Sequence, residues 1–238
     1  MPNGSGIPFR RSLSEKGLLT PENCVVAFID HQPQMLFGVA NCDRQSLISN
    51  TVALAKAVRV FGVPCVLTTV ETKGFSGYMW PQLTAIFPGV EPIERSTMNS
   101  WDDDNFVAAV ERTRRKKLVL CGLWTEVCVT FPAIQALDDG YDVYAVVDAC
   151  GDVSSLAHAS AVQRMVQAGV KPLTVLQLLL EWQRDWALRD TYGALIQIVK
   201  EHFGAYGIGV EYAYTMVHKA EPSVFPTYEP GTSQAAGH

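Results

Sequence analysis

Residues 117–129 read KLVLCGLWTEVCV, and this stretch decides the fold because it joins a buried strand to the start of a helix. The run KLVLC (117–121) is almost continuously apolar, which is typical of a parallel strand covered on both faces. Helical periodicity follows it to about Asp138, and Gly140 ends the helix. The stretch therefore predicts one strand–helix unit of an α/β sheet.

The same alternation of short apolar runs and longer helical periods extends in both directions along the chain. Five further runs predict strands, at 24–29, 64–70, 91–93, 142–147 and 170–175. Helical segments are predicted at 43–61, 102–114, 154–168, 176–187 and 190–203. The segment 71–90 is long, irregular and contains glycine, as functional loops often do. Together these elements predict an open parallel sheet of about six strands, Rossmann-like in the order 3-2-1-4-5-6, with helices on both faces.

The composition is that of a globular protein with one large domain. Of the 238 residues, 48% are hydrophobic and 18% are charged, which is enough apolar material to fill a core. We expect an N-terminal extension at 1–21, one folded domain at 22–217 and a flexible tail at 218–238, since the tail is rich in Pro, Gly, Ser and Ala.

Charge, hydropathy and cysteine usage exclude several classes of protein. The net charge is −5 and no dense block of Lys or Arg occurs, so nucleic-acid binding has little support. No apolar stretch reaches the roughly 18 residues of a membrane span, and the first residues lack the apolar middle of a signal peptide. The six cysteines are scattered, which favours reduced thiols and a cytoplasmic location.

Three polar residues stand where an open α/β sheet places its ligand crevice, beyond the carboxyl ends of the strands. Asp30 follows the first strand, Arg95 follows the third, and Cys128 lies shortly after the fourth. In the predicted order the first and fourth strands are neighbours, so Asp30 and Cys128 face each other across the crevice. The dipole of a helix capped by Thr125 would lower the pKa of the Cys128 thiol. Pro132 opposes a regular helix here, which either kinks there or begins properly only at Pro132.

Each of these residues also has a purely structural interpretation. Cys128 alone fits a buried, inert core cysteine, and Cys24, Cys65 and Cys121 fit inert strand positions better still. Asp30 alone fits a cap, and Arg95 alone a surface charge. His31 and His158 are candidate ligands only if other ligands converge on them, and no metal-binding spacing, phosphate-binding loop or dinucleotide fingerprint is present.

Longer motifs resemble a known family. The segments CVVAFIDHQ, RSTMNSWDDDNF, LVLCGLWTEVCVTFPAIQALDDGYDVYAVVDACG and EWQRDW are similar to those of the isochorismatase-like cysteine hydrolases, most of all the YcaC-type subgroup. The resemblance runs from about residue 22 to about 205 and identifies 22–217 as an isochorismatase-like hydrolase domain. It implies hydrolysis of an amide or related C–N bond through a covalent thioester.

The family's Asp–Lys–Cys triad carries over to Asp30, Arg95 and Cys128, with arginine departing from the commonest pattern. The resemblance implies that Asp30 moves the proton, Cys128 attacks the carbonyl, and Arg95 acts by charge and hydrogen bonding alone. It also implies a cis peptide at Leu123–Trp124 and an oxyanion hole formed by the amides of Trp124 and Cys128.

The resemblance also bears on metals, the pocket and partners. The nicotinamidase branch carries an Asp/His metal site after the second strand, but the segment ETKGFSGYMWPQL (71–83) contains no histidine, so we expect no metal and no cofactor. Phe37, Trp80 and Trp124 are candidate pocket residues, and Trp80 fits a core or subunit contact equally well. The implied partners are a small amide-like substrate and further copies of the chain, as a tetramer or octamer.

Two other functions remain open at the level of sequence. The fold is also compatible with a catalytically weak oligomeric scaffold, since arginine replaces the triad lysine. An activated cysteine is also compatible with a redox-responsive thiol protein.

Overall fold

The computed structural model describes residues 17–219 and contains one parallel sheet of six strands. The strands are β1 (Cys24–Ile29), β2 (Cys65–Val70), β3 (Ile93–Arg95), β4 (Lys117–Gly122), β5 (Asp142–Val146) and β6 (Lys171–Leu173). Their order is β3-β2-β1-β4-β5-β6, and every neighbouring pair is parallel. The predicted fold class and strand order are therefore confirmed.

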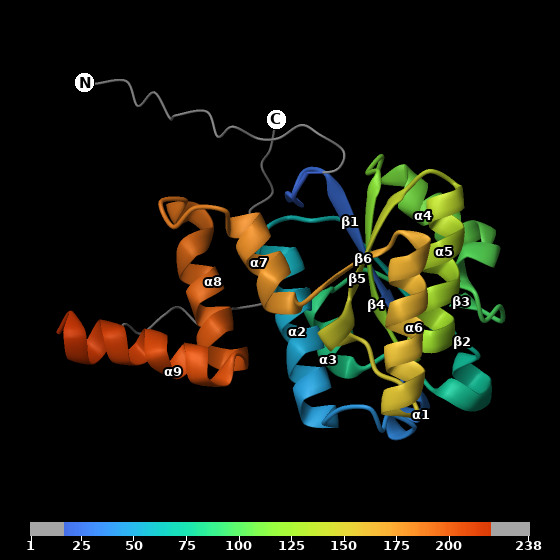
Figure 1. Cartoon of the computed structure of the whole chain (residues 1–238), viewed down its shortest axis with the longest axis horizontal. Coiled ribbons are helices and arrows are strands. Elements are labelled where there is room, and N and C mark those ends of the chain that lie inside the picture. The colour runs from blue at the N-terminus through green and yellow to red at the C-terminus, as the bar shows by residue number, and fades with distance from the viewer. Residues whose placement is uncertain (1–16, 220–238) are drawn as a thin grey trace.

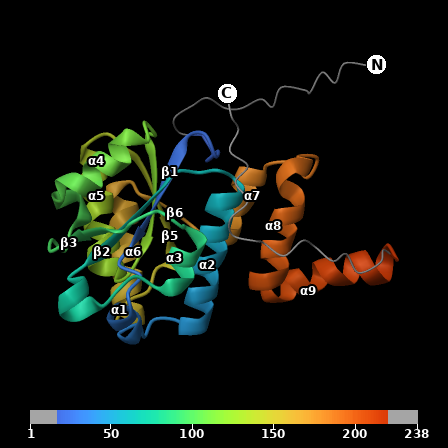
Figure 2. The same ribbon diagram turned by 180° about the vertical axis from the view of Figure 1, so that it is seen from behind.

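Helices cover both faces of the sheet, so the central strands are enclosed (Figure 1). The α-helices are α1 (Pro33–Phe37), α2 (Arg44–Val60), α3 (Pro81–Ile86), α4 (Asp104–Arg112), α5 (Thr130–Asp138), α6 (Ser155–Ala168), α7 (Val175–Gln183), α8 (Arg189–His202) and α9 (Gly204–Tyr212). Helices α4, α5 and α6 lie on one face, and α2, α3 and α7 on the other, as both views show (Figures 1 and 2). This double cover explains why β1 and β4 are buried along their whole length.

Local sequence explains where several of the helices begin. Asp43, Asp103, Ser154 and Thr174 stand at the N-caps of α2, α4, α6 and α7, and each side chain accepts a hydrogen bond from an amide of the first turn. The sheet is closely packed at the end of β4, where a Cβ on Gly122 would lie 2.5 Å from the Ile29 carbonyl oxygen. Glycine is therefore the residue that lets β4 end directly beside β1.

Two predictions about boundaries were wrong in ways that bear on function. The third strand spans Ile93–Arg95 rather than 91–93, so Arg95 is its last residue and not the residue after it. The segment 71–90 is not wholly irregular, because it contains a π-helical turn (Thr72–Ser76) and α3. Proline at the first position of α3 is a favourable helix start that resembles a loop signal in sequence.

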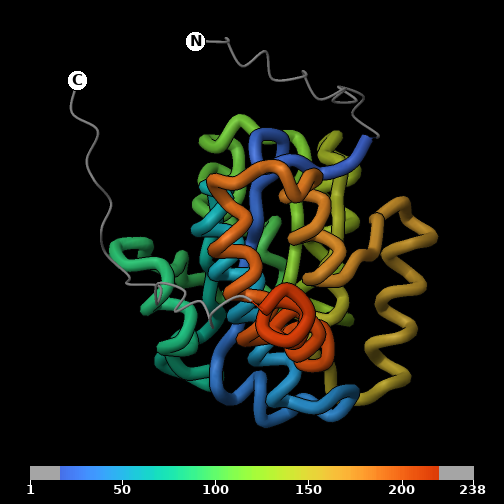
Figure 3. The backbone as a smooth tube through the Cα atoms, turned by 90° about the vertical axis from the view of Figure 1, so that its left-hand side faces the viewer, coloured from blue at the N-terminus to red at the C-terminus, as the bar shows by residue number. Residues whose placement is uncertain are grey.

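The C-terminal part of the described chain leaves the body of the domain. Helix α8 packs on α2, whereas α9 and the following turn (Ala213–Val217) pack mainly on α8 and on each other. Figures 1 and 3 show α9 projecting away from the sheet. The sequence prediction contained no helix over these residues.

The ends of the predicted domain division lie largely outside the described residues. Of the predicted extension 1–21, the part from residue 17 is described, and Leu19 in it is fully buried. Of the predicted tail 218–238, only residues 218 and 219 are described. In the described part of the chain, no helix has the length and apolar character needed to cross a bilayer.

Candidate active site

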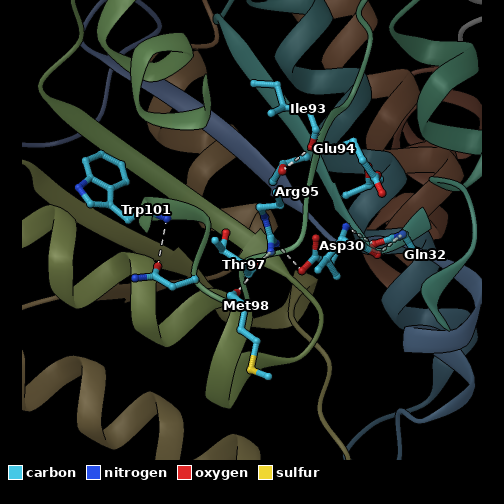
Figure 4. Close-up of polar contacts among 12 residues, drawn as sticks. Asp30, Gln32, Ile93, Glu94, Arg95, Thr97, Met98 and Trp101 are labelled. Carbon is cyan, nitrogen blue, oxygen red and sulfur yellow. Dashed lines mark hydrogen bonds and ion pairs between the residues drawn. The ribbon is translucent and has the colours of Figure 1, made fainter. Parts of the chain in front are cut away.

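A buried ion pair joins the ends of two strands at the carboxyl edge of the sheet. Asp30 follows β1 with φ of 55°, and its amide donates to the Thr68 carbonyl at 3.0 Å. The Arg95 guanidinium at the end of β3 donates from Nη2 to Asp30 Oδ2 at 2.5 Å, across the intervening strand β2 (Figure 4). Both side chains are fully buried, so little solvent screens this pair.

The guanidinium is held in place by the backbone that follows it. Arg95 Nη1 donates to the Thr97 carbonyl and, at 3.4 Å, to the Met98 carbonyl (Figure 4). Its planar group is thus fixed between a carboxylate on one side and two carbonyls on the other. The structure therefore places Arg95, to which the resemblance carried over the family's lysine, in contact with Asp30.

Cys128 lies in a π-helical turn, Thr125–Val129, which we call the Cys128 turn. This turn leads directly into α5, whose third residue is Pro132. Proline has no N–H to donate to the carbonyl four residues earlier, and the helix begins regularly only after the turn. Thr125 was predicted as the N-cap, but it is the first residue of the turn, and Trp124 occupies the cap position without a side-chain bond.

The thiol and the Asp30 carboxylate influence each other's protonation. Burial, and then the negative charge of Asp30, raise the pKa of the Cys128 thiol well above its usual range, although Arg95 opposes this. Burial raises the pKa of Asp30 to about 6, although Arg95 and the Cys128 thiol lower it. The predicted lowering of the thiol pKa by the helix start was therefore wrong, because burial beside an anion has the larger effect. Near neutral pH the resting site holds an Asp30 carboxylate and a protonated Cys128.

The Cys128 thiol lies close enough to this carboxylate that a hydrogen bond between them is one of the causes that lower the pKa of Asp30. Apart from this thiol, no described group binds Asp30 Oδ1, while Oδ2 is bound by Arg95. One carboxylate oxygen is thus held by the cation and the other is free to accept a proton.

The Leu123–Trp124 peptide is cis, as the resemblance implied. In the described part of the chain, the Trp124 amide donates to no protein group. The Cys128 amide, in contrast, donates to the Trp124 carbonyl at 2.9 Å. Of the two predicted oxyanion donors, only the Trp124 amide has its hydrogen available in this geometry.

The three predicted pocket residues lie in different environments. Phe37, at the end of α1, is 68% exposed. Trp124 is half-buried, and its indole Nε1 donates to the Met35 carbonyl at 2.8 Å. Trp80 is buried, with its ring centroid 5.0 Å from that of His31. The structure therefore brings Phe37 and Trp124 to the surface and leaves Trp80 in the core.

Two residues that the sequence interpretation missed organise this edge of the sheet. The Gln32 carboxamide bonds the amide and carbonyl of Val70 at 3.0 Å each and the Gly77 carbonyl at 2.5 Å, which ties the segment after β2 to β1. Asp152 is fully buried, and its Oδ2 accepts from the Glu126 amide of the Cys128 turn at 2.9 Å. Gln32 follows Asp30 by two residues, which was a usable signal, but Asp152 lies after β5 and has no local signature.

Two other histidines have polar partners: His158 Nδ1 lies 2.9 Å from Thr125 Oγ1, and His202 Nε2 lies 2.9 Å from Lys56 Nζ. All six cysteines are free, and burial raises the pKa of Cys24 to about 12 and of Cys65 to about 11. Burial lowers the pKa of His31 to about 3, so this ring is neutral at ordinary pH. Among the described residues, no three His, Cys, Asp or Glu side chains gather as metal ligands.

Known proteins share both the sequence pattern and the fold. The isochorismatase domain family matches residues 24–177. The probable hydrolase YcaC of Escherichia coli K12 is 35% identical over 189 residues, which are 79% of this chain and 90% of that protein.

Two solved structures are also similar. One is Escherichia coli YcaC, an octameric hydrolase of unknown specificity, with a TM-score of 0.80, 34% identity, and coverage of 84% of this chain and 97% of that one. The other is Pseudomonas aeruginosa YcaC with hexane-2,5-diol and covalent acrylamide, with a TM-score of 0.78, 34% identity, and coverage of 82% and 96%. Since the family match spans more than half of the sequence, the chain belongs to the isochorismatase family of hydrolases, in its YcaC-type subgroup.

Proposed function

We propose that this hydrolase cleaves an amide or related C–N bond of a small molecule through a thioester on Cys128, without a metal. The observation that carries the proposal is the arrangement around Asp30. Arg95 holds one carboxylate oxygen at 2.5 Å, no other described side chain binds the second oxygen, and a hydrogen bond with the Cys128 thiol lowers the pKa of the carboxyl. A base with one anchored and one free oxygen, beside a protonated nucleophile, is suited to proton transfer during attack.

The first half-reaction forms the thioester. Asp30 takes the Cys128 proton as the sulfur attacks the carbonyl carbon, and the Trp124 amide donates to the oxyanion that develops. The tetrahedral intermediate collapses when the C–N bond breaks, and protonated Asp30 gives its proton to the leaving amine. Arg95 has no proton to give at ordinary pH, so it orients Asp30 and offsets its charge.

The second half-reaction restores the enzyme. Asp30, again ionised, takes a proton from a water molecule whose oxygen attacks the thioester carbonyl. The C–S bond breaks, the carboxylic acid product leaves, and the proton on Asp30 returns to the Cys128 sulfur. The pair ends in its starting protonation state, and the net reaction consumes one water per C–N bond.

Phe37 and Trp124 are the proposed contacts for the apolar part of the substrate. The Pseudomonas aeruginosa relative was solved with covalent acrylamide, whose vinyl carbon reacts with nucleophiles, and this supports a reactive nucleophile in this family. A redox-responsive thiol has less support, because Cys128 is buried and its pKa is raised, whereas oxidant-sensing thiols are exposed and acidic.

Mass spectrometry of the protein after exposure to a panel of amides and hydroxamates tests this function. We expect an acyl adduct on Cys128 that disappears as the acid is released. The peptide that contains residue 128 should show no acyl mass increase in Cys128→Ser. Cys121→Ser, at a buried strand position, is the matched control and should still form the adduct. If the folded protein forms no adduct and releases no amine with any compound, the scaffold function replaces this one.

We further propose that the chain assembles as a homo-octamer, as the Escherichia coli relative does. Helix α9 and the turn after it expose Ile208, Tyr212, Met216 and Val217 by 59–73%, an apolar surface that a second copy would cover. Native mass spectrometry should give eight times the mass of one chain for the wild type. Ile208→Glu with Met216→Glu should give smaller species, whereas Leu156→Glu on α6, which is 77% exposed, should not. A wild-type monomer would contradict the octamer.

A further inference from the structure

The Cys128 turn contains no cap of its own, and another part of the chain binds its first amides. The Thr125 amide donates to the Gly151 carbonyl at 3.0 Å, and the Glu126 amide donates to Asp152 Oδ2 at 2.9 Å. The Thr125 hydroxyl also donates to the Gly151 carbonyl, at 3.1 Å. One dipeptide after β5 therefore satisfies the amides that a helix start leaves open.

Asp152 is an unusual residue to find at this place, because it is fully buried and lies in no ion pair with a described cation. Its carboxylate is stabilised by amides instead, since Oδ1 accepts from the Val153 amide at 2.8 Å. Burial raises the pKa of Asp152, and the two amide bonds oppose that effect. A buried carboxylate without a cation is costly and is retained where its position matters.

The backbone of Asp152 binds a third segment, which follows β1 and α1. Its carbonyl accepts from the amides of Ala40 at 2.8 Å and Asn41 at 3.3 Å, and its own amide donates to Asn41 Oδ1 at 2.7 Å. That segment also packs on the cap residue of the Cys128 turn, since a Cβ on Gly38 would lie 2.7 Å from the Trp124 ring. Asp152 thus joins the segment that follows Asp30 to the turn that carries Cys128.

We propose that Asp152 is a positioning residue, which holds the Cys128 sulfur against the Asp30 carboxylate by binding both segments at once. The inference rests on the proposed function, because it concerns proton transfer between those two groups. Loss of the carboxylate frees the Glu126 amide and lets the turn move relative to β1. A displacement of about 1 Å is enough to slow a reaction by one to two powers of ten.

Alkylation of Cys128 by acrylamide, followed by mass spectrometry, tests the inference in the full-length protein. Asp152→Asn keeps the volume and one acceptor but removes the charge, and we expect it to slow alkylation at pH 7 about tenfold. The matched control is Asp148→Asn: Asp148 also follows β5, but its Oδ1 accepts from the Val175 amide at the start of α7, at 2.8 Å, and it has no hydrogen bond to the Cys128 turn. The control should change the rate less than about twofold.

A double-mutant cycle with Asp30→Asn separates positioning from a loss of structure. If Asp152 acts by placing Cys128 against Asp30, then Asp152→Asn has less than about a twofold effect once Asp30 is already replaced. A merely structural role predicts the same tenfold slowing in both backgrounds, and that result would overturn the proposal. So would an unchanged rate in the single variant.

Two further measurements keep the test decisive. If Asp152→Asn does not fold, Asn41→Ala is the second variant, because Asn41 is half-buried and binds the Asp152 backbone. We expect it to slow Cys128 alkylation about threefold, and to have no effect on the rate in the Asp30→Asn background. An Asn41→Ala rate equal to wild type then contradicts the inference. If wild-type Cys128 reacts at the same rate with and without Asp30, the proposed function itself has failed, which is a distinguishable outcome.

Discussion

Buried polar groups are paired at one end of the strands and partly unpaired at the other. We call these two ends the amino edge and the carboxyl edge of the sheet. At the amino edge, Lys117 Nζ donates to the Gly17 and Leu18 carbonyls at 2.7 and 3.3 Å, and Asp142 binds Lys171 and the Tyr144 hydroxyl. At the carboxyl edge, buried polar atoms without a partner gather on residues that end or follow β1, β2 and β3. These atoms are Asp30 Oδ1, His31 Nδ1 and Nε2, Trp80 Nε1, Arg95 Nε, Thr97 Oγ1 and Ser100 Oγ.

In the described part of the chain, only one other buried side-chain atom lacks a partner, Nε1 of Trp182 on α7. Buried groups that lack partners are costly, and we take their concentration at one edge as support for placing the active site there. The amino edge holds the N-terminal segment on the sheet, and the carboxyl edge keeps hydrogen-bonding capacity for a ligand or water. The predictions below test this division.

Replacing Arg95 by Met should produce the largest effect, a loss of about 3–5 kcal/mol in the free energy of unfolding at pH 7, because it leaves Asp30 buried without its cation. Arg95→Lys keeps the positive charge, so its free energy of unfolding should fall much less. Chemical denaturation of the three proteins measures this. If Arg95→Met and Arg95→Lys lower the free energy of unfolding equally, the positive charge at this position does not account for the stabilisation.

Replacing Asp30 by Asn should slow acrylamide alkylation of Cys128 at pH 7 by about a hundredfold, because the thiol then has no base. Asp142→Asn, which removes a carboxylate from the amino edge, is the comparison and should leave the rate unchanged. A similar slowing in both variants would mean that the two edges do not differ in the way we infer.

Lys117→Met should lower the free energy of unfolding by about 2 kcal/mol, since it leaves two carbonyls without their charged donor. It should not change the rate of Cys128 alkylation, because Lys117 starts β4 at the opposite edge. Denaturation and alkylation are measured on the same preparation. A slower alkylation would show that the amino edge also positions the nucleophile.

The pH dependence should show the smallest effect, about tenfold per pH unit below pH 6. Burial raises the pKa of Asp30 from 3.8 to about 6, so the base is protonated and inactive below that pH. The same shift acts on stability with the opposite sign. A raised carboxyl pKa contributes stability that is fully present below about pH 4 and is lost as pH rises through 6.

Rates of Cys128 alkylation from pH 4.5 to 8 measure the first effect, and denaturation over the same range measures the second. Asp30→Asn should remove the limb near pH 6 from both profiles. If the change near pH 6 persists in Asp30→Asn, it is caused by the titration of a group other than Asp30.

Much of this architecture was predictable because it depends on local sequence. The apolar runs of β1 and β4 and the helical periods between them are strong signals, and the strand order follows from how such units wind. Asp30, Arg95 and Cys128 stood out because each adjoins a strand end. The exact end of β3 was not predictable, since a three-residue strand contains too little pattern to place Arg95 inside it.

The protonation states of Asp30 and Cys128, and the contacts that hold the Cys128 turn, could not be predicted because they depend on residues far apart in the sequence. The pKa of the Cys128 thiol is set by its burial and by the neighbouring Asp30, and the sequence around Cys128 indicates neither of these. Asp152 contacts Glu126 across 26 positions of sequence, so its role is visible only in three dimensions. Helix α9 was missed because its glycines and aromatic residues have weak helical propensity, and the docking of the chain on α8 overrides it.

The arginine at the end of β3 also limits how many charge states the site can adopt. A guanidinium holds its protons throughout the range in which proteins are folded, so only Asp30 and Cys128 exchange protons here, and near neutral pH they hold one proton between them. A lysine in the same place would add a second exchangeable proton and a further ionisation state. With arginine, the proposed nucleophile and base exchange one proton between themselves above about pH 6, and a second proton binds to Asp30 only below that pH. Bulk solution has to supply only the water that is consumed.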